Sequence, residues 1–251
     1  MAQYYNHAKQ YMKSYRPPDR RHCGIADDIM ALTAIDATML GDGKNVENIC
    51  KFASIELDAG AGNEWLYGRA GYLYFLRMVK ARFMEDAKAT KLIDSTADAV
   101  IKAIMACPRP WTWHGSAYLG AAHGTIGIMT QIVLTNPAWA PKLAPELEEF
   151  LTYQYDSGNW PSSLPPGQDR LVQVCHGAPG IIISLQSIKQ YFPDLQDKIE
   201  AAITKGTRCI QERGLLTKEP GLCHGISGNA LALDGNEFEH FLSFSKWECI
   251  G

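Results

Sequence analysis

Apolar stretches alternate with charged, amphipathic stretches along most of this chain. The apolar stretches each follow shortly after a glycine and comprise residues 72–83, 126–134 and 181–188. The amphipathic stretches carry apolar residues at helical spacing with charged residues opposite, and they comprise residues 91–106, 143–155 and 195–212. Alternation typical of β-strands is almost absent. The pattern therefore predicts an all-α protein in which a buried inner helix and an amphipathic outer helix alternate.

A repeated glycine motif opens these units. Near-copies of one hexapeptide (Ala-His-Gly-Thr-Ile-Gly, Cys-His-Gly-Ala-Pro-Gly and Cys-His-Gly-Ile-Ser-Gly) occur at residues 122–127, 175–180 and 223–228. Their first glycines, with Gly68 and more weakly Gly24, recur at intervals of roughly 50 residues, which suits helix pairs with variable loops. Inner helices around an axis with outer helices behind them form an α/α toroid, so one such domain is predicted for residues 1–251. Glycine at each helix entry would let backbones approach closely.

Alignment of the units on that glycine produces two columns of potential metal ligands. One column holds His123, His176 and His224, and the column before it holds Cys175 and Cys223. On loops at helix entries, Cys175, Cys223 and His224 can converge on one ion. Two thiolates and an imidazole suit zinc, and three protein ligands leave one tetrahedral position open, as in catalytic sites. Buried cysteines and core histidines without a metal would produce the same pattern.

Composition argues against several other classes of protein. Apolar residues make up 46% of the 251 residues, which is enough for a packed core, and the net charge of −3 gives no reason to expect nucleic-acid binding. Residues 110–141 carry no Asp, Glu, Lys or Arg, but polar residues and prolines interrupt them before about 20 apolar residues accumulate, so no membrane span is expected. Seven cysteines without a secretory signal favour a reducing compartment, and a cytoplasmic location is expected.

Four ordered segments carry a resemblance to a known family. They are Asn-Glu-Trp-Leu-Tyr-Gly-Arg-Ala-Gly-Tyr-Leu-Tyr (63–74), Trp-His-Gly-Ser-Ala-Tyr-Leu-Gly-Ala-Ala-His-Gly (113–124), Cys-His-Gly-Ala-Pro-Gly (175–180) and Gly-Leu-Cys-His-Gly-Ile-Ser-Gly-Asn (221–229). The chain resembles the lanthionine synthetase C-like proteins over essentially its whole length, and their eukaryotic branch more than the bacterial lantibiotic cyclases. The resemblance implies a toroid of helical hairpins. About five of the family's seven would be present, so the domain would be truncated at both ends and its ring incomplete.

The resemblance also implies roles for individual residues. The family binds one zinc ion through Cys, Cys and His, which match Cys175, Cys223 and His224. His123 matches the family's proposed proton donor or acceptor. A lysine that binds glutathione in the eukaryotic branch matches Lys218, although an ordinary lysine in an exposed loop would look the same.

Three further assignments leave alternatives open. Glu64 stands where the bacterial enzymes use an acidic residue in catalysis, but it could instead be a charge beside a helix N-terminus. His176 follows a zinc ligand and is expected to line the pocket. Arg170 lies near the position of an arginine of the bacterial enzymes, in a register that the sequence does not fix. Val174 replaces the family's usual tryptophan, which would reshape the pocket without removing a ligand.

These features together predict zinc-dependent addition of glutathione to dehydroalanine or dehydrobutyrine residues of proteins or peptides, which forms a thioether. Zinc would provide the thiol as a thiolate at neutral pH, and His123 would supply a proton to the product. Two alternatives are a glutathione- or zinc-binding module without catalysis and an intramolecular cyclase of the lanthionine type. Because hairpins are expected to be missing, the sequence leaves open whether this chain is an active enzyme.

Overall fold

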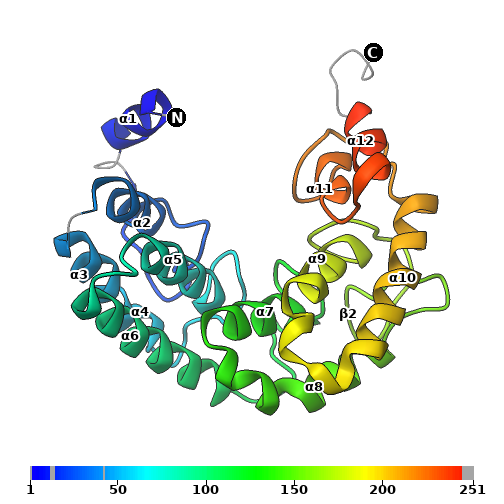
Figure 1. Cartoon of the computed structure of the whole chain (residues 1–251), viewed down its shortest axis with the longest axis horizontal. Coiled ribbons are helices and arrows are strands. Elements are labelled where there is room, and N and C mark those ends of the chain that lie inside the picture. Colours follow the sequence, from blue (N-terminus) through cyan, green and yellow to red (C-terminus); the bar gives the residue numbers. More distant parts are fainter. Residues whose placement is uncertain (1, 12–14, 42, 245–251) are drawn as a thin grey trace. The chain divides into compact units, whose positions relative to one another are not determined.

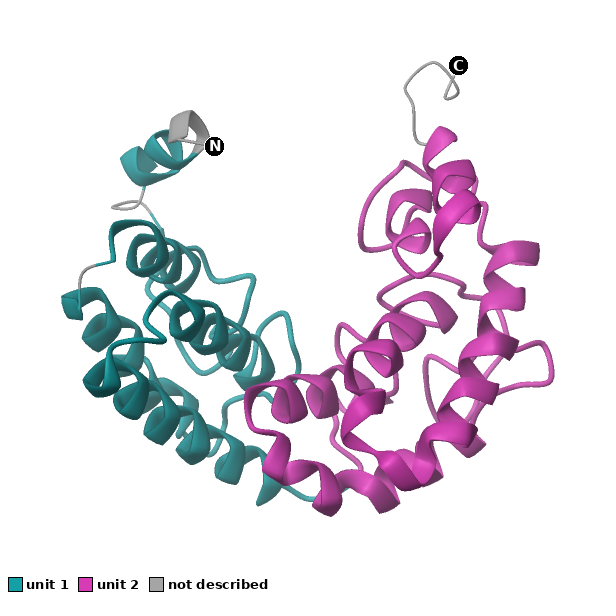
Figure 2. Cartoon of the chain, in the orientation of Figure 1, with its two compact units in different colours: residues 1–109 teal, residues 110–251 magenta. Residues whose placement is uncertain are grey.

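The computed structural model describes residues 2–11, 15–41 and 43–244 (Figure 1). The chain divides into two compact units, residues 1–109 and 110–251 (Figure 2). Helices dominate both units, and the strands among the described residues are only β1 (Ala117–Tyr118) and β2 (Ser163–Leu164), which pair antiparallel. The predicted all-α class is therefore confirmed. That residues 1–251 act as one toroidal domain stays a prediction.

The first unit begins with α1 (Ala2–Tyr11) and contains two helix pairs. In the first pair, α2 (Asp28–Leu40) packs against α3 (Gly43–Lys51), and the short α4 (Ala53–Glu56) follows. In the second pair, α5 (Arg69–Arg82) packs against α6 (Ala87–Met105). α2 and α5 also contact each other. The apolar stretch 72–83 and the amphipathic stretch 91–106 thus form an inner and an outer helix, as predicted.

The second unit contains three helix pairs, and it holds most of the candidate site residues. Its inner helices are α7 (Thr125–Thr135), α9 (Ala178–Ile188) and the short α11 (Ile226–Ala230), and each is followed by an outer helix: α8 (Ala140–Thr152), α10 (Gln196–Arg213) and α12 (Gly235–Ser243). α9 contacts both α7 and α11, so the inner helices form one layer, and each inner helix packs against the outer helix that follows it (Figure 2). The described residues therefore contain five helix pairs, the number expected.

Burial explains why these segments form two layers. On α10 the buried residues recur at intervals of three or four and form a single stripe: Ile199, Ala202, Ile203, Gly206, Cys209 and Ile210. On α9 eight of the eleven residues are buried, because the helix packs against α7, α10 and α11. Each fully buried isoleucine contributes about 2 kcal/mol relative to an exposed one, so apolar burial drives the pairing of α9 with α10.

The glycines of the repeated motif cap the inner helices. The first glycine of each motif is the N-cap residue of its helix, at Gly68, Gly124, Gly177 and Gly225. The second glycine, three residues later in each case, lies in the first turn and packs against the loop that precedes the helix. A Cβ atom added there would lie 2.1 Å from a loop carbonyl oxygen at Gly127 and 1.9 Å from one at Gly180 and at Gly228. Only glycine fits this contact without a shift of the backbone.

Within the described residues, no helix combines the length and the apolar character needed to cross a membrane. The charge-free residues 110–141 instead contain β1, α7 and the 3-10 turn η2 (Pro137–Trp139), and they lead into α8. Their lack of charge follows from burial, because seven of the eleven residues of α7 are buried.

Replacing Gly180 with Ala is expected to lower the free energy of unfolding by about 1–3 kcal/mol, because the added methyl group needs the space of the Val174 carbonyl oxygen. Gly167→Ala is the matched control, since a Cβ atom there meets nothing within 4 Å. Urea unfolding followed by circular dichroism measures both variants. Equal stabilities would contradict the tight contact at Gly180.

Candidate metal centre

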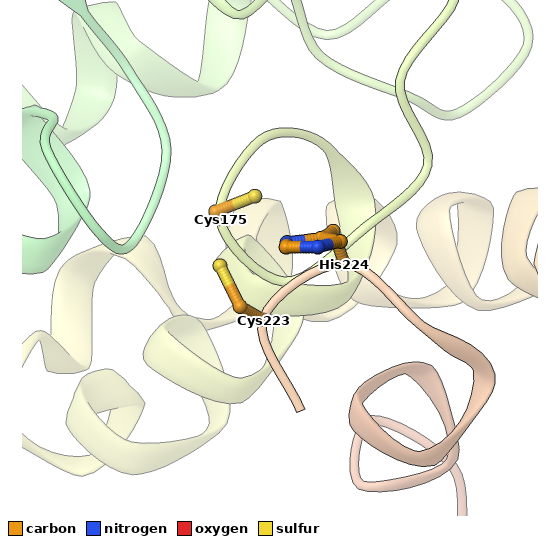
Figure 3. A group of neighbouring side chains, drawn as sticks. All are labelled: Cys175, Cys223 and His224. Carbon is orange, nitrogen blue, oxygen red and sulfur yellow. The ribbon is translucent and has the colours of Figure 1, made fainter. Parts of the chain in front are cut away.

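Cys175, Cys223 and His224 lie together in the second unit (Figure 3). Each offers one ligand atom, and these three atoms lie within 4.8 Å of one another. Cys175 precedes the N-terminus of α9, whereas Cys223 and His224 precede that of α11, so the ligands come from two consecutive repeats. Figure 3 shows both sulfur atoms and the imidazole ring directed toward a common centre. The three side chains could therefore hold a metal ion, and both the binding and the identity of the metal stay predictions.

The spacing and chemistry of the donor atoms fit zinc. Zinc binds thiolate sulfur at about 2.3 Å and imidazole nitrogen at about 2.0–2.1 Å, so tetrahedral ligand atoms lie roughly 3.5–3.8 Å apart. Donor atoms already within 4.8 Å of one another need to move by only about 1 Å to reach that spacing. Soft sulfur ligands select zinc over magnesium or calcium. Cys175 is buried while Cys223 and His224 are exposed, so the centre is anchored on one side and accessible on the other.

The thiol of Cys175 is harder to deprotonate than that of an ordinary cysteine. Burial raises the pKa of the Cys175 thiol, and the neighbouring Cys223 raises it further because two adjacent thiolates repel each other. A divalent cation removes this penalty, since it stabilises deprotonated sulfur directly. The side-chain amide of Gln173 also favours the thiolate, because its Nε2 donates a hydrogen bond to the Cys175 sulfur over 3.0 Å.

Backbone contacts at Cys175 join three consecutive repeats. The backbone N–H of Cys175 donates to the carbonyl oxygen of Cys223 over 3.0 Å, which ties the two ligand loops together. On the other side, a Cβ atom added to Gly120 would lie 2.1 Å from the carbonyl oxygen of Cys175. The loop that carries His123 therefore packs directly on the loop that carries Cys175. Gly120 is not one of the motif glycines for which close approach was predicted, but it too lies where two backbones approach closely.

Two fully buried asparagines hold the loop that leads to Cys175. Asn159 donates from Nδ2 to the carbonyl oxygen of Leu171 over 3.0 Å, and its Oδ1 accepts from the first N–H of α9. Asn229 donates from Nδ2 to the carbonyl oxygen of Val172 over 2.9 Å. Consecutive carbonyl groups of one loop are thus held by a residue of the loop between α8 and β2 and by a residue of α11. This arrangement fixes the backbone immediately before the metal ligand.

An ion pair joins the same loop to α10. Arg213 donates to Asp169 over 2.7 Å, and Asp169 also accepts from Ser157 and from Asn159. Burial alone would raise the pKa of the Asp169 carboxyl, but the hydrogen bonds from Arg213, Ser157 and Asn159 outweigh it and hold the pKa at about 2. The carboxylate therefore stays ionised and paired at any ordinary pH.

His123 lies in a cluster of aromatic rings. Its ring stacks on that of Trp113, with centroids 4.5 Å apart and an angle of 11° between the planes. The ring centroid of His176 lies 6.1 Å from that of His123 and 5.4 Å from that of Tyr118. Burial lowers the pKa of His176, and nearby His123 lowers it further, because two imidazolium ions would repel each other. Both effects favour the neutral form of His176.

The remaining predicted residues lie in different surroundings. Lys218 donates from Nζ to Oε1 of Gln173 over 3.1 Å, so it reaches the metal centre through one side chain. Arg170 is exposed on the loop before Cys175. Glu64 belongs to the first unit, is 1% exposed, and accepts hydrogen bonds from the backbone N–H groups of two nearby residues, Leu66 and Tyr67. These bonds shape the turn before α5, and a catalytic role for Glu64 stays a prediction.

Comparison with known proteins identifies the family. A sequence model of the lanthionine synthetase C-like protein family matches residues 2–236. The chain belongs to the lanthionine synthetase C-like family. The glutathione S-transferase LANCL1 of Danio rerio is 32% identical over 183 residues, which make up 67% of this chain and 45% of that protein. The LanC-like protein GCL1 of Arabidopsis thaliana is 32% identical over 185 residues, or 69% of this chain and 42% of that protein. The matches thus span less than half the length of either relative.

Several residues that build the site in this LanC-like chain were not singled out from its sequence. Trp113 and Asn229 fall inside two of the segments that resemble the family, 113–124 and 221–229. The alignment of the repeats could have drawn attention to them as an aromatic and a polar residue close to the glycine motif. Gln173, Asn159 and Arg213 carry no comparable signal. Each acts through a partner remote in the sequence, so only the folded chain reveals its role.

Asp169→Asn is expected to reduce the free energy of unfolding by about 1–2 kcal/mol at pH 7, because the ion pair with Arg213 is lost. An unfolded aspartate has a pKa of about 3.9. The native pKa is lower, so the stabilisation is complete above about pH 4 and disappears as the pH falls toward 2. Urea titrations at pH 7 and pH 3 test this. Asp156→Asn, at an exposed carboxylate of the same region, is the control, and a difference from wild type that does not change with pH would contradict the assignment.

Proposed function

We propose that this LanC-like protein binds one zinc ion through Cys175, Cys223 and His224 and adds the thiol of glutathione to dehydroalanine or dehydrobutyrine residues of proteins or peptides. The observation that carries the proposal is the meeting of two sulfurs and an imidazole nitrogen within 4.8 Å, with one side of the group exposed. The name of the Danio rerio relative, a glutathione S-transferase, supports glutathione as the thiol.

The metal centre would activate the thiol. When bound, zinc lowers the pKa of a coordinated thiol, so the sulfur is present as a nucleophilic thiolate at neutral pH. Three protein ligands leave one tetrahedral position for the incoming sulfur. Because Cys223 and His224 are exposed, the incoming thiol would approach from their side.

Lys218 would bind the rest of the thiol substrate. Its ammonium group, which is exposed apart from its contact with Gln173, can hold a glutathione carboxylate as a point charge. A carboxylate held by Lys218 would place the glutathione thiol beside the candidate metal centre, because Gln173 contacts both Lys218 and Cys175. Lys218 also argues against the intramolecular cyclase, which needs no glutathione carboxylate to be held.

The addition step needs a proton donor, and we assign this role to His123. The glutathione sulfur forms a bond to the β-carbon of the dehydroamino acid, and the π-electron pair moves to the α-carbon, which must then be protonated. One proton leaves the thiol and one arrives at the α-carbon, so nothing else is consumed. The His123 ring is suited to the transfer because stacking on Trp113 fixes its orientation and its neighbour His176 favours the neutral form.

A reducing compartment such as the cytoplasm suits this chemistry. Thiolate ligands and glutathione are both lost when oxidised to disulfides. The six cysteines in the described part of the chain are all free thiols. We therefore include a cytoplasmic location in the proposal.

Metal analysis tests the ligand set. The purified chain is expected to hold one zinc ion, measured by inductively coupled plasma mass spectrometry, and the variants Cys175→Ala and Cys223→Ala are expected to lose it, because two remaining ligands bind zinc weakly. Cys107→Ala is the matched control, since Cys107 is a free cysteine of the first unit. Full zinc content in Cys223→Ala would show that the assigned ligands are wrong.

Mass spectrometry tests the reaction itself. A dehydroalanine peptide incubated with glutathione and the protein is expected to gain the mass of one glutathione. His123→Ala should slow this by roughly a hundredfold or more at unchanged zinc content, whereas His240→Ala, at an exposed histidine of α12, should not. Lys218→Met should raise KM for glutathione more than it lowers kcat. Zinc and glutathione binding without adduct would indicate the non-catalytic module, and ring closure in a cysteine-bearing peptide without glutathione would indicate the cyclase.

A further inference from the structure

Gln173 is a buried amide next to the candidate metal centre, and it takes part in no chemical step of the proposed reaction. It is 7% exposed and precedes Cys175 by two residues. Its Nε2 donates to the Cys175 sulfur over 3.0 Å, and its Oε1 accepts from Lys218 Nζ over 3.1 Å. One side chain therefore connects a proposed zinc ligand to the residue proposed to bind glutathione.

The orientation of this amide follows from its partners. A lysine ammonium has three N–H groups and no acceptor, so the oxygen of Gln173 must face Lys218. The NH₂ group then has to face the sulfur of Cys175, which consequently acts as an acceptor. A metal-bound thiolate has no proton to donate, so its sulfur can only accept a hydrogen bond. The orientation of the amide therefore fits a metal-bound Cys175.

The backbone of Gln173 is held as firmly as its side chain. Its N–H donates to the carbonyl oxygen of His176 over 3.2 Å, which closes the turn around Cys175. The carbonyl of the preceding Val172 is fixed by Asn229. The amide therefore reaches both partners from a fixed position.

The contact with Lys218 strengthens the contact with sulfur. A positive charge at the oxygen polarises the amide and makes its N–H a better donor, because hydrogen bonds in a chain reinforce one another. A stronger N–H···S bond stabilises the negative charge on a metal-bound sulfur and fixes its orientation. Groups that hold metal ligands in this way typically change metal affinity by roughly ten- to a hundredfold when they are removed.

We infer that Gln173 is a positioning residue that orients the Cys175 sulfur for zinc and transmits the charge of Lys218 to it. The inference rests on the proposed zinc site. It makes the thiol-binding lysine and the metal ligand parts of one hydrogen-bonded chain. A thiol substrate that brings a carboxylate to Lys218 would therefore alter the metal centre as well as bind beside it.

The test measures metal binding by the whole chain. Gln173→Met keeps the length of the side chain but can neither donate nor accept as an amide does. A competition titration with a chromophoric chelator is expected to show zinc affinity reduced by roughly ten- to a hundredfold. Gln168→Met, at an exposed glutamine of the same loop, should bind zinc like the wild type.

Cobalt substitution separates positioning from general damage. Without the N–H donor the sulfur holds its lone pair less tightly, so the thiolate-to-cobalt charge-transfer band of Gln173→Met is expected to move to longer wavelength. Damage to the fold would lower the amount of bound cobalt but leave the band where it is in the wild type. Wild-type affinity and an unchanged band would overturn the inference and leave the zinc site intact. A wild-type chain that binds neither metal would instead overturn the proposed function.

A double-mutant cycle tests the link to Lys218. Lys218→Met is expected to weaken zinc binding several-fold in the wild-type background and to have no further effect in Gln173→Met, because its charge acts through the amide. An equal effect in both backgrounds would show that Lys218 does not act through Gln173. Lys218 is exposed, so its replacement is not expected to disturb the fold. If Gln173→Met does not fold, the zinc affinity and the cobalt band of Lys218→Met still test the inference.

Discussion

The contact between the second glycine of each motif and a carbonyl oxygen of the preceding loop is the constraint on which the rest of the structure depends. At Gly180 and Gly228 a methyl group would lie 1.9 Å from that oxygen, so the loop lies directly on the first turn of its own helix. Every loop that obeys this constraint follows a similar path. Residues at the same position of the motif therefore project in similar directions. Cys and His residues at that position consequently recur at equivalent places in successive repeats.

Buried polar side chains also hold the loop before Cys175 in place. Asn159 and Asn229 are fully buried, and the side-chain NH₂ group of each donates to a backbone carbonyl of the loop before Cys175. Removing such an amide leaves buried carbonyl groups without partners, which costs about 1–3 kcal/mol for each group. Directional hydrogen bonds thus hold the loop that carries Cys175. Apolar burial drives the packing of the helices, and hydrogen bonds position the loop that carries Cys175.

The helices and the ligand group could be predicted from the sequence because both have periodic signals. The expected inner segment 181–188 lies within α9, and the expected outer segment 195–212 agrees closely with α10. The columns of Cys and His indicated convergence, and the three side chains do meet. Gln173 and Arg213 could not be found in this way, because their partners Lys218 and Asp169 are remote in the sequence and belong to no repeat. Val174 shows the same limit: its side chain packs against Gly228, a neighbour that the sequence alone does not reveal.

If the centre binds zinc as proposed, the division of its ligands between two loops also has a mechanical consequence. Full coordination requires the hairpin of α9 and the short hairpin of α11 to be in their native positions at the same time. The free energy of coordination is then also cohesion between adjacent hairpins, as expected when an ion binds only the folded state. The same few atoms would consequently serve both metal capture and the attachment of the α11 hairpin to the α9 hairpin.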